Sequence, residues 1–340
     1  MDKLINFLII PVLVLCNVIS YEQKDSSRNI NFIDKRIRII IDNDFGGDPD
    51  GLFALAHHLL SPSVEIKAII GSKQYDGGFY DYPGSATHAA EMAKELLAAM
   101  NLEKKYTVLE GSNTGLKDTL TPAVSEGAKA IVQEAMKDDK KPLFVVCGAG
   151  LTNIASAYLM EPKIAERIIL VWIGGTEYDG LAWPPPGADK KWEYNTGIDV
   201  KAVQVIFNQS NIPIWQVPRN AYRQCLTSYA ELKYKLKPAG KTGTYLLGRL
   251  EDLMKRADRK LGEAYVLGDS PLVLLTALQS SWEVDPSSSK YVFKECPGVS
   301  DIGIFELNPI GRNIRVYDII DTRLMFEDFF AKLALAGSSH

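Results

Sequence analysis

Residues 36–60, which read RIRIIIDNDFGGDPDGLFALAHHLL, decide the fold. The β-branched run over residues 36–42 is typical of a strand that is buried in a parallel sheet. An acidic loop interrupts this run over residues 42–50, and residues 52–60 then predict a helix. Residues 64–71 predict a second strand, so the stretch begins a β-α-β unit whose crossover we expect to be right-handed.

The same alternation of strands and helices continues along the chain. Further strands are predicted at residues 105–110, 142–147, 167–172 and 212–217, and helices at residues 86–100, 125–136, 152–160, 199–207 and most of 229–264. The remaining predictions are an irregular rim or lid loop (183–192), β-like alternation (291–318) and a closing helix (322–335). We therefore predict one α/β domain over residues 32–336, with a mostly parallel central sheet flanked by helices, as in Rossmann-like folds.

Composition narrows the class of protein. The 340 residues are 46% hydrophobic and 24% charged with a formal net charge of -4, which excludes a disordered chain, a collagen and a multi-span membrane protein. The mild acidic balance argues against a nucleic-acid partner, because positive charge supplies most of that affinity. The sequence contains no GxxxxGK[ST], GxGxxG or GxSxG motif, so a phosphate-binding loop and a serine hydrolase have no support.

Residues 1–20 have the organisation of a secretory leader. Lys3 precedes an apolar run over residues 4–15, and Ser20 stands at the small-residue position before a cleavage site. We therefore predict a signal peptide that is cleaved near Ser20, and a secreted or periplasmic protein. A retained anchor helix is one alternative, although the run is short for a membrane span. A lipid anchor at Cys16 is another, although the residue before it is bulky for that processing.

The acidic loop is the strongest chemical signal. Asp42, Asp44, Asp48 and Asp50 fall within nine residues, and carboxylates gathered in one loop repel each other unless a hard divalent cation with oxygen ligands binds there. The glycines at 46 and 47 allow the backbone to fold back so that the carboxylates converge. A solvated turn is the alternative, with Asp50 placed favourably near a helix N-terminus.

This loop resembles the opening of a known family, the calcium-dependent nucleoside hydrolases of the inosine-uridine type, in which a strand runs into an Asp-x-Asp-Pro-Gly-x-Asp-Asp loop. Four further stretches are similar to elements of that family and occur in its order: Gly150-Leu-Thr-Asn-Ile-Ala155, Trp172-Ile-Gly-Gly175, Trp192-Glu-Tyr-Asn195 and Gly268-Asp-Ser-Pro271. The resemblance covers nearly all of the chain after the leader. It implies the nucleoside hydrolase fold and Ca²⁺-assisted hydrolysis of the N-glycosidic bond of ribonucleosides or related N-ribosides.

The resemblance also implies roles for single residues. Asp44 would be the general base and a metal ligand. Further metal ligands would be the carboxylates of Asp48, Asp50 and Asp269 and a backbone carbonyl of Cys147 or Gly148. Contacts to the ribose would come from Asp48, Ile173, Glu193 and Asn195. The division of roles between Asp48 and Asp50 stays open, and a helix N-cap is the alternative role for Asp269.

Two positions depart from the family pattern. Gly268 stands where the family often has a histidine that can protonate the leaving base, and Ser72 stands where an asparagine that binds ribose is usual. These departures keep two alternatives open: a hydrolase of another glycoside on the same fold, and a non-catalytic calcium-dependent sugar-binding protein. Tyr75, Tyr178 and Trp192 are candidate rim residues that could assist the leaving group. We expect a small nucleoside or sugar as the substrate and no membrane span. A homo-oligomer is compatible with the sequence.

Overall fold

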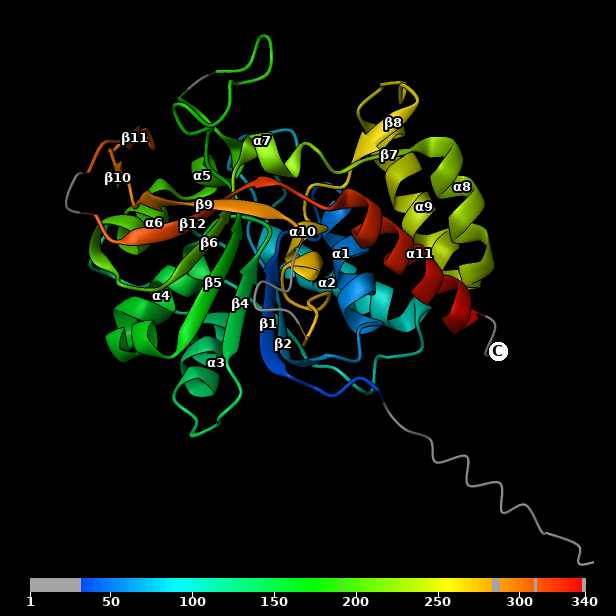
Figure 1. The fold of residues 1–340 in the computed structure, drawn as a ribbon, viewed down its shortest axis with the longest axis horizontal. Helices are drawn as coiled ribbons and strands as arrows, with labels where there is room; N and C mark the ends of the chain where they lie inside the picture. Colours follow the sequence, from blue (N-terminus) through cyan, green and yellow to red (C-terminus); the bar gives the residue numbers. More distant parts are fainter. Residues whose placement is uncertain (1–31, 190, 283–287, 309–310, 338–340) are drawn as a thin grey trace, which may run out of the picture. The chain divides into compact units, whose positions relative to one another are not determined.

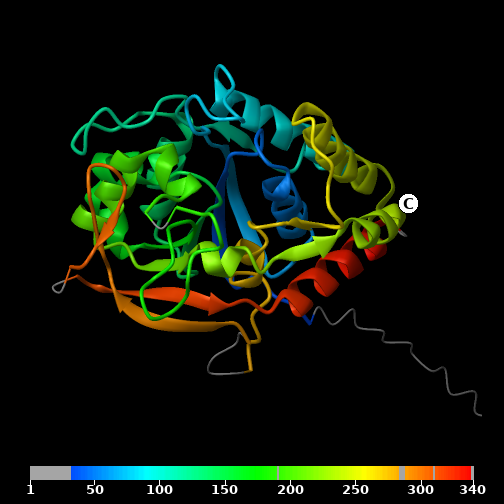
Figure 2. The same cartoon turned by 90° about the horizontal axis from the view of Figure 1, so that it is seen from above.

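The central sheet has eight strands in the order β3-β2-β1-β4-β5-β6-β12-β9 (Figure 1). Their bounds are β1 (Ile37–Asn43), β2 (Val64–Gly71), β3 (Val108–Glu110), β4 (Leu143–Cys147), β5 (Ile168–Ile173), β6 (Ile214–Val217), β9 (Lys290–Glu295) and β12 (Asn313–Ile319). Neighbouring strands are parallel except at one edge, where β9 runs antiparallel to β12 (Figure 2). The prediction of a mostly parallel sheet is therefore confirmed.

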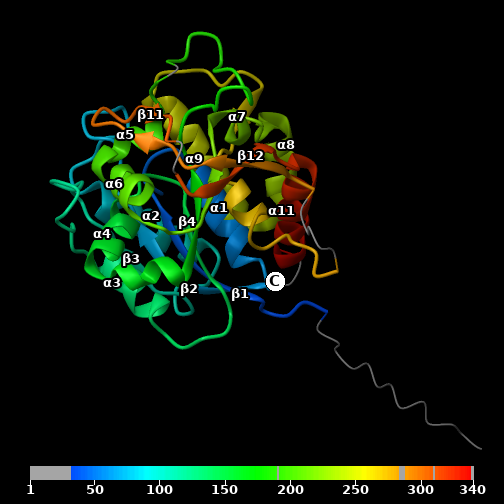
Figure 3. The same cartoon turned by 60° about the vertical axis from the view of Figure 1, so that its left-hand side comes forward.

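Helices cover both faces of the sheet, as the β-branched central strands require. Ile39 and Ile41 of β1 pack on one face, and Ile40 packs on the other. The first face is covered by α1 (Asp50–Leu59), α2 (Ser85–Ala99), α8 (Tyr229–Leu236), α9 (Gly240–Arg256), α10 (Pro271–Leu274) and α11 (Thr322–Gly337). The second face is covered by α3 (Glu126–Ala135), α4 (Thr152–Met160) and α6 (Val200–Gln204). Figure 3 shows α8, α9 and α11 grouped on the same side of the sheet.

Short elements follow the strand ends. They are α5 (Tyr194–Ile198), α7 (Arg219–Tyr222), the antiparallel pair β7 (Leu226–Ser228) and β8 (Ala264–Val266), and the pair β10 (Gly298–Val299) and β11 (Phe305–Glu306). Two 3-10 turns (Pro162–Glu166 and Lys237–Ala239) and a π-helical turn (Val205–Gln209) complete the list. Because α7 begins two residues after the end of β6, its side chains lie at the same edge of the sheet as the loop after β1.

The stretch predicted to be mostly helical over residues 229–264 forms two helices, α8 and α9, and only its last residue, Ala264, belongs to strand β8. The two helices are separated by the 3-10 turn Lys237–Ala239, where Pro238 cannot donate a backbone hydrogen bond to the preceding turn. Gly240, which follows this turn, has a φ of 56°, a value that glycine adopts readily. Both helices pack on the same core.

The computed structural model describes residues 32–189, 191–282, 288–308 and 311–337. The predicted leader, its cleavage site and Cys16 lie outside these ranges, so export stays a prediction from the sequence. Residues from Ile33 onward form one α/β unit. Within the described ranges, no helix combines the length and the apolarity that crossing a membrane requires.

Candidate active site

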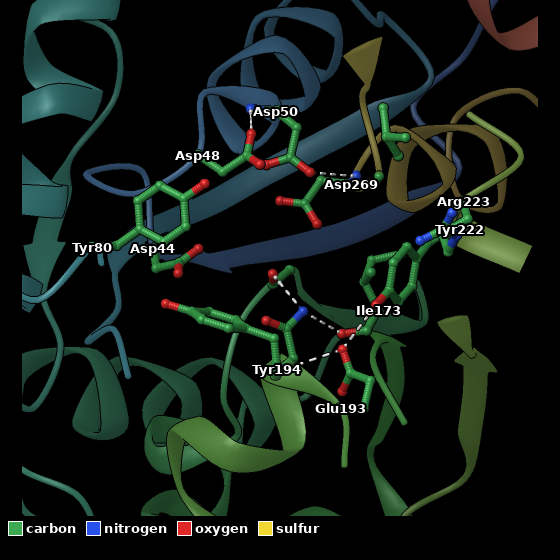
Figure 4. A pocket seen from close by; sticks show the side chains of 14 residues that line it. Asp44, Asp48, Asp50, Tyr80, Ile173, Glu193, Tyr194, Tyr222, Arg223 and Asp269 are labelled. Carbon is green, nitrogen blue, oxygen red and sulfur yellow. Dashed lines mark hydrogen bonds between the residues drawn. The ribbon is translucent and has the colours of Figure 1, made fainter. Parts of the chain in front are cut away.

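A cavity of about 270 Å³ lies at the carboxyl ends of the central strands (Figure 4). Its wall contains all but one of the predicted site residues: Asp44, Asp48, Asp50, Gly148, Ile173, Glu193, Asn195 and Asp269. The exception is Cys147, which is fully buried in β4 with its Sγ directed at Asp42 Oδ2 (4.0 Å). Of the two residues considered as carbonyl ligands, Gly148 lines the cavity, and its carbonyl accepts from Asn195 Nδ2.

The loop between β1 and α1 presents three carboxylates to the cavity. A tight turn, closed by the Gly47 amide donating to the Asp44 carbonyl at 2.8 Å, brings Asp44 and Asp48 together. The Asp50 amide donates to Asp48 Oδ1 at 3.2 Å, and Asp50 Oδ1 accepts from the Gly51 amide at 2.8 Å. Asp50 therefore opens α1 with its charge at the helix N-terminus, which is the favourable end.

Asp269 joins this cluster from a distant part of the chain. Its backbone amide donates to Asp50 Oδ2 at 3.2 Å, and its Oδ2 accepts from Asn43 Nδ2 at 2.8 Å. The N-cap of α10 is Ser270, and no side chain caps that helix. The alternative role of Asp269 as a helix cap is therefore not what its side chain does in this structure.

Burial and mutual repulsion make the cluster hard to ionise. Burial raises the pKa of Asp44 and Asp50 well above their ordinary range, and the charges of Asp269 and Asp48 raise both further. Burial also raises the pKa of Asp269 to about 7, against the hydrogen bond from Asn43. The pKa of Asp48 is raised chiefly by burial, and a hydrogen bond from the Tyr265 hydroxyl opposes this shift. A nearby cation would favour the ionised form of every member.

Asp42, the first aspartate of the predicted acidic loop, does not join the cluster. It accepts hydrogen bonds from the Ser72 hydroxyl and from Asn153 Nδ2 (3.0 Å), and burial raises its pKa to about 6. Ser72 therefore points into the protein toward Asp42 and not into the cavity. Asp42 therefore lies apart from the other three aspartates of the stretch, because it is still part of β1 and its side chain points behind the site.

The opposite wall is built on α5. Glu193 caps this helix, and donors from the protein occupy both of its carboxylate oxygens. Its Oε2 accepts from the Gly175 amide (2.8 Å) and from the amide and hydroxyl of Thr196. Its Oε1 accepts from the Asn195 amide (3.2 Å) and the Tyr222 hydroxyl (3.1 Å). Asn195 donates through Nδ2 to the carbonyls of Gly148 (3.1 Å) and Ile173 (2.9 Å). These bonds use both Nδ2 protons, so its Oδ1 is the group that can receive a hydroxyl from a ligand.

Gly148 leaves no room for a side chain at this wall. A Cβ atom there would lie 2.3 Å from Asn43 Nδ2 and 2.6 Å from Asp269 Oδ2. Any side chain would therefore push apart the hydrogen bond that holds Asp269 in the cluster.

Sequence reasoning missed Tyr80, Tyr222, Arg223 and Val266, which also line the cavity, and gave Tyr194 no role. Tyr222 and Arg223 lie at the end of the short helix α7 that follows β6, so the rule that ligands bind at strand ends could have found them. Of the three candidate rim aromatics, Tyr75 and Trp192 pack on the Tyr194 ring with centroids 6.0 and 6.1 Å away. Tyr178 instead donates to Gln216 Oε1 at 2.6 Å, and none of the three candidate rim aromatics lines the cavity itself.

Comparison with known proteins finds related sequences and folds. The profile of the family described as inosine-uridine preferring nucleoside hydrolase matches residues 39–303. The inosine-uridine preferring nucleoside hydrolase of Crithidia fasciculata is 35% identical over 203 residues, which is 53% of this chain and 58% of that protein. The enzyme of the same name from Leishmania major is 36% identical over 196 residues, which is 51% of this chain and 57% of that protein. The matched stretch thus spans little more than half the length of either relative.

The fold comparison extends further along the chain. The crystal structure of the inosine-uridine preferring nucleoside hydrolase from Bacillus anthracis superposes with a TM-score of 0.63, covering 88% of this chain and 99% of that one at 17% identity. At that identity the superposition concerns the fold, whereas the profile match concerns the sequence and includes the acidic loop, the Asn195 segment and Asp269. The chain therefore belongs to the inosine-uridine preferring nucleoside hydrolase family.

Proposed function

We propose that the protein hydrolyses the N-glycosidic bond of ribonucleosides or related N-ribosides, releasing ribose and the free base, with Ca²⁺ as cofactor. The observation that carries this proposal is the carboxylate cluster, in which Asp269 joins the three aspartates of the loop after β1 on one wall of the cavity. Asn195 lines the same cavity and keeps an open acceptor. Family membership supports the same reaction.

The donor set suits calcium better than a softer metal. The cavity wall offers only oxygen ligands near the cluster, from the carboxylates and the Gly148 carbonyl, and calcium takes six to eight oxygens. Among the residues that the structure describes, no three His, Cys, Asp or Glu side chains already surround one ion position. Binding would therefore draw carboxylates inward, and the relief of the repulsion that raises their pKa values would favour this movement.

The residues of the chain then divide the reaction between them. Asp44 accepts a proton from the attacking water, because its carboxylate faces the cavity and can act as a general base. The negative charge of the cluster stabilises the oxocarbenium-like sugar as the C–N bond breaks. Asn195 Oδ1 accepts a ribose hydroxyl and orients the sugar. When bound, calcium would supply Lewis acidity and a fixed point for the ribose hydroxyls.

The decisive test measures base release from a panel that includes inosine and uridine, with calcium and then with chelator. Asp44→Asn should lower kcat about 10²- to 10⁴-fold with the fold intact, because the amide cannot accept the proton. Asp50→Asn is the matched control, since it removes the same charge without removing the proposed base, and excess calcium should partly rescue it. Restoration of Asp44→Asn to near wild-type turnover by calcium would make Asp44 a ligand only, with Asp48 as the next candidate base.

A sugar-binding protein without turnover is the second candidate function, and Gly268 favours it because glycine cannot protonate a leaving base. Calorimetry with ribose separates the two functions. Calcium-dependent ribose binding without release of base from any member of the panel would support this second function and reject hydrolysis.

A further inference from the structure

The ring of Tyr222 takes the space beside Gly268, where the family pattern has its acid. A Cβ atom on Gly268 would lie 3.4 Å from Tyr222 Cδ2 and 3.3 Å from Asp50 Oδ2. The Tyr222 hydroxyl is already committed, because it donates to Glu193 Oε1 at 3.1 Å. Burial and the Glu193 charge raise the pKa of Tyr222, so its proton stays in that hydrogen bond. The wall beside Gly268 therefore has neither the histidine nor a free Tyr222 proton to give to a departing base. The other two tyrosines of the cavity, Tyr80 and Tyr194, lie on the side of Asp44 (Figure 4).

Arg223, the next residue, is the only cation among the described residues that line the cavity. Its side chain is exposed and makes no hydrogen bond or ion pair with any residue in the described ranges, although its charge helps to lower the pKa of Glu177. Helix α7, which Arg223 directly follows, is fixed because Arg219 at its start pairs with Glu177 at 2.7 Å and donates to the carbonyls of Asp189 and Trp192. Since Arg219 already pairs with Glu177, the Arg223 guanidinium keeps its hydrogen-bond donors for a ligand.

The position of this guanidinium matches the geometry of the reaction. In a displacement at the anomeric carbon, the water enters on one face of the sugar and the base departs on the other. Asp44 and Tyr80 lie on one side of the cavity, and Tyr222 and Arg223 lie on the opposite side (Figure 4). If Asp44 activates the water, the departing base faces the wall that carries Arg223.

We propose that Arg223 is a catalytic residue that stabilises the departing base as an anion, in place of an acid at position 268. The electron pair of the C–N bond goes to the base nitrogen, which the guanidinium stabilises with charge-assisted hydrogen bonds. Water forms the new C–O bond, and its proton passes to Asp44. The base takes its proton from solvent after release, because an arginine stays protonated throughout. Tyr222 is a positioning residue that fills the space beside Gly268. This inference rests on the proposed hydrolysis.

The test compares two substrates that differ in how much help their leaving group needs. Inosine has a poor leaving group, whereas 4-nitrophenyl riboside releases a stable phenolate. Arg223→Gln should lower kcat for inosine about 10- to 100-fold, which is less than the loss of a fully buried oxyanion donor because Arg223 is exposed. It should change kcat for 4-nitrophenyl riboside by less than about threefold. Arg223→Lys should recover part of the inosine activity, since it keeps a cation.

Arg259→Gln is the matched control, because it removes the same charge at an exposed position outside the cavity, and melting curves verify that each variant is folded. Equal losses on both substrates, a change in KM alone, or full activity of Arg223→Gln on inosine would each overturn the role of Arg223. Failure of the wild-type protein to cleave either substrate would instead reject the proposed hydrolysis itself, so the two failures are distinguishable.

Discussion

Asp269→Asn should stabilise the metal-free protein, although it removes a site residue. The folded-state pKa of Asp269 is about 7, above the ordinary value of 3.8. The folded state therefore holds this proton more tightly than the unfolded state, and stability falls as the pH rises from about 4 to 7. At 1.36 kcal/mol per pKa unit, ionised Asp269 costs on the order of 4 kcal/mol at pH 8 and less than about 2 kcal/mol at pH 5. Asparagine carries no such cost, and its carbonyl can still accept from Asn43 Nδ2.

Calorimetry in chelator measures this effect. With an unfolding entropy of about 2.1 cal/mol/K per residue, a domain of roughly 300 residues shifts by about 1.6 °C per kcal/mol, so the variant should melt about 6 °C higher than wild type at pH 8. Calcium at a thousandfold excess over Kd should abolish the difference, because the wild type keeps the carboxylate and gains about 4.1 kcal/mol from binding. The exposed Asp138→Asn is the control for charge alone.

Two results would refute this reasoning about Asp269. One is a metal-free wild type that is at least as stable as the variant at pH 8. The other is a stability difference of equal size at pH 5 and pH 8, which would show that the ionisation of Asp269 is not its cause.

Two further variants test the packing behind the site. Gly148→Ala should lower the free energy of unfolding by about 1–3 kcal/mol and abolish tight calcium binding, because the new Cβ would displace Asn43 and Asp269. Urea unfolding measures the first effect and calcium titration the second. An unchanged calcium affinity would contradict the role of Asp269 as a calcium ligand. Asn153→Ala should lower the free energy of unfolding by about 2–3 kcal/mol, because the buried Asn153 amide donates to Asp42 Oδ1 and accepts from the Ser112 amide at 3.0 Å. A loss below 0.5 kcal/mol in urea unfolding would show that water replaces these bonds.

The local pattern of the sequence determined much of the fold. The β-branched run of β1, the acidic loop and the start of α1 are adjacent in the chain, so their hydrophobic periodicity and turn residues specify them without any distant partner. The same holds for the strand ends at Gly148 and Ile173, which the parallel-sheet prediction places at one edge. Over residues 229–264 the apolar periodicity indicated helix correctly, and Pro238 and Gly240 mark the point where the stretch divides into α8 and α9.

The composition of the cavity wall was decided by tertiary structure. Asp269 meets Asp50 across 219 residues of chain, and its place in the site came to the sequence analysis only through a family resemblance. Residue spacing also does not reveal the buried hydrogen bond between Ser72 and Asp42 or the donors that occupy Glu193. Nor does it reveal that Tyr222 packs beside Gly268. The physical reason is that hydrophobic periodicity fixes which face of a strand is buried, whereas the order β1-β4-β5-β6 fixes which loops meet. That order is set by long-range packing of the whole sheet and not by any local stretch of sequence.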